Sequence, residues 1–244
     1  MIAAIAAGGR VSSDLADVIG TDIKALAPFD GRTLLDVALA AAAQAGASRI
    51  VVVGPRAVRA RCGTHADEVI DESPSGRENL ARALGAAEAN RPLLFLASDL
   101  PFVTGGDVAA FVARANGSDV ALPLARATAY EERFPGAAPH ATRVGGERIV
   151  NGSVAYFGPG GAPRALAATL DLFDARKSLW RMAALLGPQL LVRFATGTLR
   201  IAHIERRARV RFELEARAVR DAPPGLCYDV DTLADYRYAL AATR

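Results

Sequence analysis

The sequence predicts a one-domain α/β protein with three layers, in which helices cover both faces of a mostly parallel sheet. Short apolar runs alternate with segments of helical periodicity from the first residue onward. Such alternation implies right-handed crossovers between parallel strands. The composition agrees, because 51% of the residues are hydrophobic and only 6% aromatic, which suits helices on a sheet better than a β-sandwich. A length of 244 residues fits one α/β core.

The first half of the chain contains the clearest elements. The run at 2–6 is apolar and ends at Gly8-Gly9, and the run at 49–53 is β-branched and ends at Gly54-Pro55, so both are expected to be buried strands. Segments with helical periodicity lie between the expected strands, and Thr33 is the expected N-cap of the first of these helices. The other strands expected in this half lie at 68–70, 93–97 and 119–122, and the helices lie at 33–45, 77–89 and 107–115.

The segment 125–150 breaks this pattern. It has little periodicity, and long irregular segments in compact domains are usually functional or disordered. We therefore expect an irregular insert around 125–150 that contributes to a binding site. Beyond it the alternation resumes, with strands expected at 154–157 and 217–219 and helices at 174–186, 201–214 and 233–242.

Cysteine usage and hydropathy exclude several classes of protein. Cys62 and Cys227 are too few for a disulfide framework and too far apart for a CxxC metal site, so we expect reduced thiols and a cytoplasmic location. The apolar N-terminus lacks the basic region of a signal peptide. No apolar stretch is long enough to span a bilayer, so no membrane association is expected.

Residues 200–220 contain a cluster of arginines, although the net charge of the chain is only +3. Glutamates are interleaved with them, and no aromatic residues alternate with them as stacking platforms would require. We interpret the segment as a solvated helix face and predict no nucleic-acid binding. The arginines are Arg200, Arg206, Arg207, Arg209, Arg211, Arg217 and Arg220.

Two candidate binding features come early in the chain. Open α/β sheets bind ligands beyond the carboxyl ends of their strands, and Ala7-Gly8-Gly9-Arg10 follows the first strand. Glycines there let backbone N–H groups approach a phosphate or a base closely, although a Gly-Gly pair is also an ordinary turn. Lys24 comes next, after a polar loop, and is either a phosphate-binding cation or a surface lysine.

A third candidate is the start of a helix that carries Gly76, Arg77 and Asn79. A helix N-terminus with an arginine forms a suitable anion site, and simple capping explains the same residues equally well.

Acidic residues form the fourth candidate. Asp99 directly follows an apolar strand, which places it at the ligand-binding edge of the sheet, and Asp229 and Asp231 form a second acidic pair near the C-terminus. Carboxylates are the ligands that Mg²⁺ prefers, usually one or two of them together with substrate phosphates. A turn at Asp99 and a helix cap at Asp231 are the structural alternatives.

Together these segments resemble the MobA-like NTP transferase family, which has the Rossmann-like, GT-A-like fold of nucleotidyltransferases. The resemblance covers most of the chain, with only a loose match over 125–215. In chain order the matching segments are Ala6-Ala-Gly-Gly-Arg10, Lys24-Ala-Leu with Gly31-Arg-Thr-Leu-Leu35, Arg49-Ile-Val-Val-Val-Gly54, Ser98-Asp-Leu-Pro101 and Asp229-Val-Asp-Thr232 with Asp235-Tyr236.

The resemblance implies a role for each charged candidate. Lys24 would contact the nucleotide phosphates, and Asp99 would bind Mg²⁺, or Mn²⁺ in its place. One of Asp229 or Asp231 would complete the metal site. Lys24 and Asp99 would thus be the catalytic residues.

The glycine-containing segments would bind the nucleotide. Gly8 and Gly9 would lie against it, and Gly76-Arg-Glu-Asn79 would be a second loop that contacts base and phosphate. One departure from the family concerns the residues after the glycines, where an Arg-(Met/Leu/Phe)-Gly step is usual. The segment 11–23 contains no arginine, and Arg10 is the cation available to replace it.

The implied reaction is Mg²⁺-dependent transfer of a nucleotidyl group from an NTP to a small acceptor, with release of pyrophosphate. An acceptor phosphate or hydroxyl would attack the α-phosphorus. Cations in the irregular insert and near residue 176 suggest a phosphorylated acceptor. The candidate acceptor residues are Arg133, His140, Arg143, Asn151, Arg176 and Lys177.

Two alternatives stay open at this point. Asp229-Val-Asp231 is formally a DxD motif, which would suit a GT-A glycosyltransferase using a nucleotide-sugar, although the DxD of those enzymes normally follows a mid-chain strand. A non-catalytic nucleotide-binding protein of the same fold would account for the altered glycine loop. A dehydrogenase is not expected, because the GxGxxG fingerprint is absent.

Overall fold

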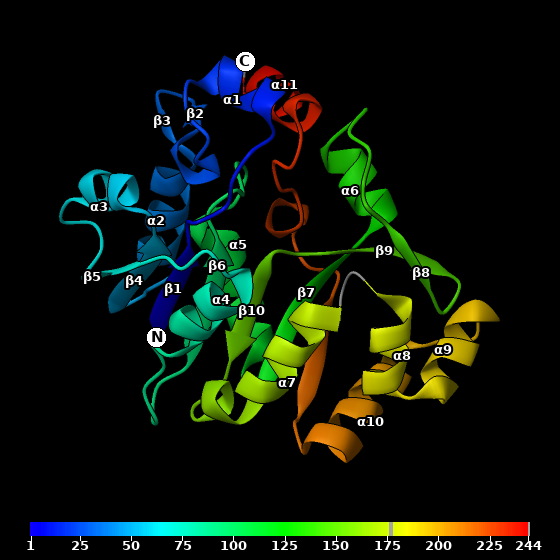
Figure 1. The fold of residues 1–244 in the computed structure, drawn as a ribbon. Helices are drawn as coiled ribbons and strands as arrows, with labels where there is room; N and C mark the ends of the chain where they lie inside the picture. The colour runs from blue at the N-terminus through cyan, green and yellow to red at the C-terminus, as the bar shows by residue number, and fades with distance from the viewer. Residues whose placement is uncertain (176–177, 244) are drawn as a thin grey trace.

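The structure, a computed structural model, describes residues 1–175 and 178–243. Its main-sheet strands are β1 Ile2–Ala6, β4 Arg49–Gly54, β5 Glu68–Asp71, β6 Leu93–Ala97, β7 Val120–Arg126, β8 Thr142–Val144, β9 Glu147–Asn151, β10 Val154–Phe157 and β11 Ala216–Arg220. Within the described ranges these nine strands form one sheet in the order β5-β4-β1-β6-β10-β7-β9-β8, with β11 also paired to β7 (Figure 1). A separate ribbon pairs β2 Pro28–Phe29 with β3 Arg32–Thr33.

The strands of the first half are parallel, as the alternation of strands and helices predicts. β1 pairs in parallel with β4 and with β6, and β4 pairs in parallel with β5. β10 enters between β6 and β7 and is antiparallel to both, while β11 is parallel to β7. The carboxyl ends of the four parallel strands therefore meet at one edge of the sheet, which is where ligands of open α/β sheets bind.

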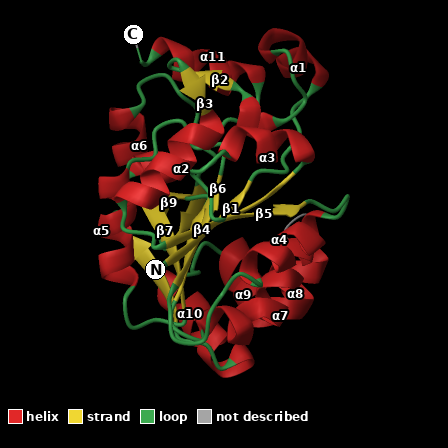
Figure 2. Cartoon of the chain, turned by 90° about the vertical axis from the view of Figure 1, so that its left-hand side faces the viewer, coloured by secondary structure: helices red, strands yellow, loops and turns green. Residues whose placement is uncertain are grey.

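Helices cover both faces of this sheet (Figure 2). Their bounds are α1 Ser13–Ile19, α2 Leu34–Gln44, α3 Arg56–Cys62, α4 Gly76–Leu84, α5 Gly105–Ala115, α6 Ala127–Arg133, α7 Gly161–Ala175, α8 Leu179–Leu186, α9 Pro188–Ala195, α10 Ile201–Phe212 and α11 Leu233–Ala241, with 3-10 turns η1 Lys24–Leu26 and η2 Pro224–Leu226. No helix within the described ranges has the length and hydropathy needed to cross a bilayer.

The core consists of two apolar clusters, one on each face of the sheet. Ala3 and Ile5 of β1 point into the cluster that contains α2 and α5, whereas Ile2 and Ala4 point into the cluster that contains α4 and α7. This alternation follows from the two-residue period of a strand, and it explains why both kinds of position in β1 are apolar. The predicted three-layer α/β fold is confirmed.

The segment 125–150 contains regular elements, contrary to the expected irregular insert. β7 runs to Arg126, α6 follows it, and β8 and β9 form a hairpin. The hairpin turn is Gly145-Gly146, whose φ angles of 62° and 85° are the positive values that two-residue turns need. Periodicity does not reveal these elements because each is short and prolines lie between α6 and β8.

The helix expected at 174–186 is also different in the structure. α7 ends at Ala175 and α8 begins at Leu179, while residues 176 and 177 lie outside the described ranges. The apolar spacing of these residues does not show where one helix ends and the next begins.

The segment 11–23 contains a helix, α1, that its sequence does not predict. Gly20 follows the last residue of α1, and its φ of 74° is the left-handed conformation that is common directly after helices.

The contact between α2 and α5 depends on Gly105, the first residue of α5. A Cβ atom there would overlap the Gln44 side chain and lie 3.1 Å from the Gln44 carbonyl carbon. We expect Gly105→Ala to lower the free energy of unfolding by about 1–3 kcal/mol, as overpacking does. Urea unfolding monitored by circular dichroism measures this change.

The matched control is the next residue. A Cβ on Gly106 would meet only Thr104 Oγ1, at 3.8 Å. Gly106→Ala should therefore leave stability unchanged or raise it by up to about 1 kcal/mol, because alanine is the better helix former. Equal effects of the two substitutions would contradict the role given to Gly105.

Candidate active site

The residues that follow β6 meet the C-terminal segment of the chain. Asp99 lies in the turn that follows β6, and its carbonyl oxygen accepts a hydrogen bond of 3.0 Å from the main-chain N–H of Val230. Gly225 permits this approach, because a Cβ there would lie 2.6 Å from the carbonyl oxygen of Phe102. Two acidic segments that are 130 positions apart in the sequence are therefore neighbours at the carboxyl edge of the sheet.

Lys24 lies between these two segments. Its Nζ is 3.1 Å from Asp99 Oδ2 and 2.6 Å from Asp231 Oδ1. The Lys24 side chain is only 11% exposed. Burial by itself would lower the pKa of the ammonium, but Asp99 and Asp231 outweigh burial and the net shift is upward. Lys24 is therefore a charged lysine in the folded protein at neutral pH.

Asp229 differs from the other two carboxylates because it has no cation of its own within 4 Å among the described residues. Its Oδ2 accepts a hydrogen bond of 3.0 Å from the hydroxyl of Ser153, which lies between β9 and β10. Burial, and then the charges of Asp99 and Asp231, raise its pKa to about 6. The Asp229 carboxyl group therefore titrates closer to neutral pH than an ordinary aspartate does.

The charge balance of the cluster fits a divalent cation. Three carboxylates face one ammonium, and Asp99 Oδ1 is buried without a hydrogen-bond partner in the described part of the chain. A buried acceptor without a donor is costly, and a cation would relieve that cost. The same residues contain no group of three or more His, Cys, Asp or Glu side chains arranged to hold a metal ion. The donor set therefore suits a cation shared with ligand phosphates, which is the usual mode for Mg²⁺.

The glycine loop after β1 is joined to Lys24 by main-chain contacts. The N–H of Lys24 donates to the carbonyl oxygen of Gly9 at 2.9 Å, and Arg10 forms an isolated antiparallel bridge with Ile23. The segment between Arg10 and Ile23, which includes α1, therefore forms a closed loop whose two ends lie side by side. The glycine loop and Lys24 are therefore neighbours, although segment 11–23 contains no arginine.

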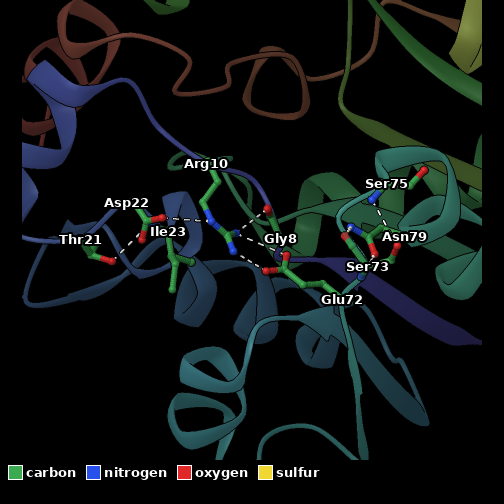
Figure 3. Close-up of polar contacts among 9 residues, drawn as sticks. All are labelled: Gly8, Arg10, Thr21, Asp22, Ile23, Glu72, Ser73, Ser75 and Asn79. Carbon is green, nitrogen blue, oxygen red and sulfur yellow. Dashed lines mark hydrogen bonds and ion pairs between the residues drawn. The ribbon is translucent and has the colours of Figure 1, made fainter.

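Arg10 is engaged by two acidic residues (Figure 3). Its guanidinium donates to the carbonyl oxygen of Gly8 at 2.7 Å, forms an ion pair with Glu72 and lies 3.2 Å from Asp22 Oδ2. Sequence reasoning missed Glu72, although it directly follows β5 and so shares the ligand-binding edge with the glycine loop. A Cβ on Gly8 would meet the end of the Glu72 side chain, so the Glu72 carboxylate lies directly against the glycine loop.

The residues at the start of α4, 76–79, have side chains in two different environments. Asn79 lies beside the glycine loop, where its side-chain amide bonds to the main-chain N–H and C=O of Ser73 at 2.6 and 2.8 Å. Gly76 packs against α7, and Arg77 forms an ion pair of 2.5 Å with Asp174 of α7. The structure therefore brings Asn79 to the candidate site and directs the Arg77 side chain to a neighbouring helix.

The acceptor candidates are not linked to one another by hydrogen bonds or ion pairs in the described residues. Arg133 ends α6 with its guanidinium 5.1 Å from the ring centroid of Phe134. Three other candidates have exposed side chains: His140, Arg143 and Asn151. The remaining two, Arg176 and Lys177, lie outside the described residues.

The MobA-like NTP transferase domain is the family whose model matches this chain, over residues 3–189. The match spans well over half of the chain, which therefore belongs to the MobA-like NTP transferase family. No curated protein sequence matches the chain.

Solved structures with the same fold include a hypothetical transferase from Thermus thermophilus, which is 27% identical with a TM-score of 0.84 and covers 96% of this chain and 98% of its own. A nucleotidyl transferase from Methanothermobacter thermautotroptrophicus is 20% identical with a TM-score of 0.60, covering 100% and 97%. A 2-C-methyl-D-erythritol 4-phosphate cytidylyltransferase, also from Thermus thermophilus, is 19% identical with a TM-score of 0.57, covering 99% and 98%. The likeness to the last two concerns the fold.

The raised pKa of Asp229 predicts that Asp229→Asn stabilises the protein at neutral pH. In the folded state its pKa is about 6, above its value of 3.8 in an unfolded chain, so ionised Asp229 costs stability above pH 6. Asparagine keeps a hydrogen bond to Ser153 and removes the charge. We expect a gain of about 2–3 kcal/mol at pH 7.5, which shrinks as the pH falls from 6 to 4. Chemical denaturation in metal-free buffer at both pH values measures it; a gain that does not depend on pH would contradict this account.

Proposed function

We propose that this member of the MobA-like NTP transferase family transfers a nucleotidyl group from an NTP to a small, phosphorylated acceptor and releases pyrophosphate. One observation carries the proposal. A charged, mostly buried lysine lies against a glycine loop at the carboxyl edge of a parallel sheet and contacts two carboxylates from distant segments. Such an arrangement supplies what nucleotidyl transfer requires, which is positioning and charge neutralisation rather than covalent chemistry.

The nucleotide would bind along the glycine loop. Backbone N–H groups of Gly8 and Gly9 would face it, and Asn79 and Glu72 lie on the other side of the same loop. Lys24 would donate to the phosphates, because it is protonated and adjacent to Gly9. Positioned cations of this kind stabilise the charge that develops on the phosphate oxygens in the transition state.

A divalent cation is part of the proposal because the site as a whole is acidic. Both cations beside the glycine loop, Arg10 and Lys24, are already paired with carboxylates, so an NTP would meet little free positive charge. Asp99, with its unpartnered Oδ1, and one of Asp229 or Asp231 would hold Mg²⁺ or Mn²⁺. When bound, such an ion polarises phosphate oxygens and offsets their charge.

The reaction would proceed by in-line displacement. An acceptor oxygen forms a bond to the α-phosphorus, the bond from the α-phosphorus to the bridging oxygen breaks, and pyrophosphate leaves with that electron pair. A phosphate acceptor is already ionised and needs no general base. The acceptor would bind near α6 and the β8–β9 hairpin, whose cationic residues include Arg133 and Arg143.

The donor can be identified by thermal unfolding with ATP, GTP, CTP and UTP, each with and without Mg²⁺. A ligand at 100 times its Kd stabilises the folded state by about 2.7 kcal/mol, which for a chain of this size raises Tm by roughly 5–10 °C. We expect one NTP to produce such a shift only in the presence of Mg²⁺. Asp99→Asn should abolish it, whereas Glu132→Gln, a matched change at an exposed residue of α6, should not. A shift with nucleotide-sugars alone would instead favour the glycosyltransferase alternative.

The catalytic part of the proposal is tested at Lys24. Lys24→Ala is expected to lower kcat by about 10²–10³-fold, the usual cost of removing one stabilising charge from a transition state. Lys24→Arg keeps the charge and should lose less. Pyrophosphate release under saturating NTP measures both variants, with Tm recorded beside it to exclude unfolding. Near-full turnover by Lys24→Ala would remove Lys24 from the mechanism.

A further inference from the structure

Five of the seven arginines of residues 200–220 fall into two groups in the structure. In the first group, each guanidinium already has a partner. Arg209 forms an ion pair with Glu215, Arg220 forms one with Glu147, and Arg217 donates to main-chain carbonyls at the C-terminal end of α5. In the other group, Arg206 and Arg207 have no carboxylate partner among the described residues. A helix face with interleaved, paired charges is therefore found at Arg209, whereas Arg217 and Arg220 lie in β11 and Arg206 and Arg207 have no interleaved carboxylate partner in the described part of the chain.

The second group lies on one face of α10. His203, Arg206, Arg207 and Val210 are spaced at i, i+3, i+4 and i+7, which places them in one stripe. The stripe lines a pocket of about 440 Å³ whose other wall is the α8–α9 turn and α9, including Arg193 in the last turn of that helix. Figures 1 and 2 show α8, α9 and α10 at the opposite end of the molecule from α1 and α11, so this pocket is separate from the candidate active site.

The pocket is built around positive charge. None of its lining residues is acidic, and Nε of Arg207 is buried without a hydrogen-bond partner in the described residues. The Arg207 guanidinium packs against Gly187, where a Cβ would lie 3.0 Å from Nη2. Pro188 and Gln189 begin α9 at the same wall, so the positive end of that helix dipole also faces the pocket. Unpaired guanidinium groups held together in this way favour an anionic ligand.

His203 adds a neutral donor to this set. Its Nδ1 accepts a hydrogen bond of 3.1 Å from the main-chain N–H of Arg200, so in the neutral ring the proton is on Nε2. Partial burial and the nearby charges of Arg193, Arg200 and Arg206 lower the pKa of the imidazole. The ring is thus neutral at pH 7 and retains one N–H.

We propose that the pocket between the α8–α9 turn and α10 is a binding site for a small molecule that carries a phosphate or diphosphate group. Three guanidinium groups and an imidazole N–H offer more donors than the two oxygens of one carboxylate accept, whereas a phosphoryl group presents three strongly accepting oxygens. The volume is that of a small-ligand site. The proposal does not depend on nucleotidyl transfer, because it concerns a different part of the molecule.

The test uses proton NMR of the histidines in the full-length protein, titrated with inorganic pyrophosphate. The chain has only three histidines, so His203 can be followed beside His65 and His140, with His203→Gln to assign its signal. Buffer freed of divalent metal and held at constant ionic strength keeps pyrophosphate out of the acidic candidate active site. We expect the C2–H signal of His203 alone to shift and to saturate, with a Kd below about 1 mM. Its pKa should rise when the anion is bound.

Matched variants separate a built site from general attraction to a basic helix. Arg206→Gln and Arg207→Gln should each weaken binding about tenfold or more, and so should Arg193→Gln on the other wall. Arg209→Gln removes the same charge from the same helix, but its guanidinium is paired with Glu215, so binding should change less than about twofold. Removing the unpaired arginines breaks no internal ion pair, and unchanged circular dichroism confirms folding. Lys24→Ala should leave pyrophosphate binding in metal-free buffer unchanged.

Two results would overturn the proposal. One is equal weakening by Arg209→Gln and by the pocket variants, or shifts of all three histidines without saturation, which would indicate diffuse electrostatic attraction. The other is saturable binding of a short single-stranded oligonucleotide with no binding of pyrophosphate, which would assign the surface to nucleic acid.

Discussion

The attraction between the Lys24 ammonium and the carboxylates of Asp99 and Asp231 joins the loop after β1, the end of β6 and the segment before α11. Hydrogen bonds also hold the C-terminal segment in place. The Tyr236 hydroxyl donates to the carbonyl oxygen of Pro28 at 2.6 Å, and the capping box at Thr232 fixes the start of α11. These hydrogen bonds position the segment before α11. The ammonium offsets the negative charges of Asp99 and Asp231 at short range, because two neighbouring carboxylates without a cation would repel each other.

The same cluster lowers the free energy of unfolding relative to a core in which every polar group is paired. Asp99 Oδ1 has no hydrogen-bond partner in the described residues, and Asp229 is ionised at neutral pH against the charges of two neighbours. Other polar groups are paired in the usual way, as in the capping box of α2 at Thr33. Among the described residues, the one other buried side-chain atom without a hydrogen-bond partner is Arg207 Nε, in the pocket beside α10. Unsatisfied groups at the sheet edge are what is expected of a site completed by its ligands.

The two cationic regions of the molecule differ in how their charges are balanced. At the glycine loop, Arg10 and Lys24 are each held by carboxylates, so a phosphate ligand there must arrive with a counter-charge of its own. In the pocket beside α10, Arg206 and Arg207 have no such partners among the described residues, and an anion can bind without a metal. The contrast follows from the carboxylates that tertiary folding brings to the glycine loop, since none of the described residues that line the pocket beside α10 is acidic.

The sequence by itself determined the fold class, most long elements to within a few residues, and the edge of the sheet where Gly8, Gly9 and Asp99 lie. These follow from periodicity and from the position of a residue just after a strand, which are local properties. Only the tertiary structure decided that Arg10 forms an ion pair with Glu72 and that Arg77 forms one with Asp174. It also decided which arginines have no carboxylate partner among the described residues. An ion pair depends on distances between elements that are remote in sequence, and no local pattern encodes those distances.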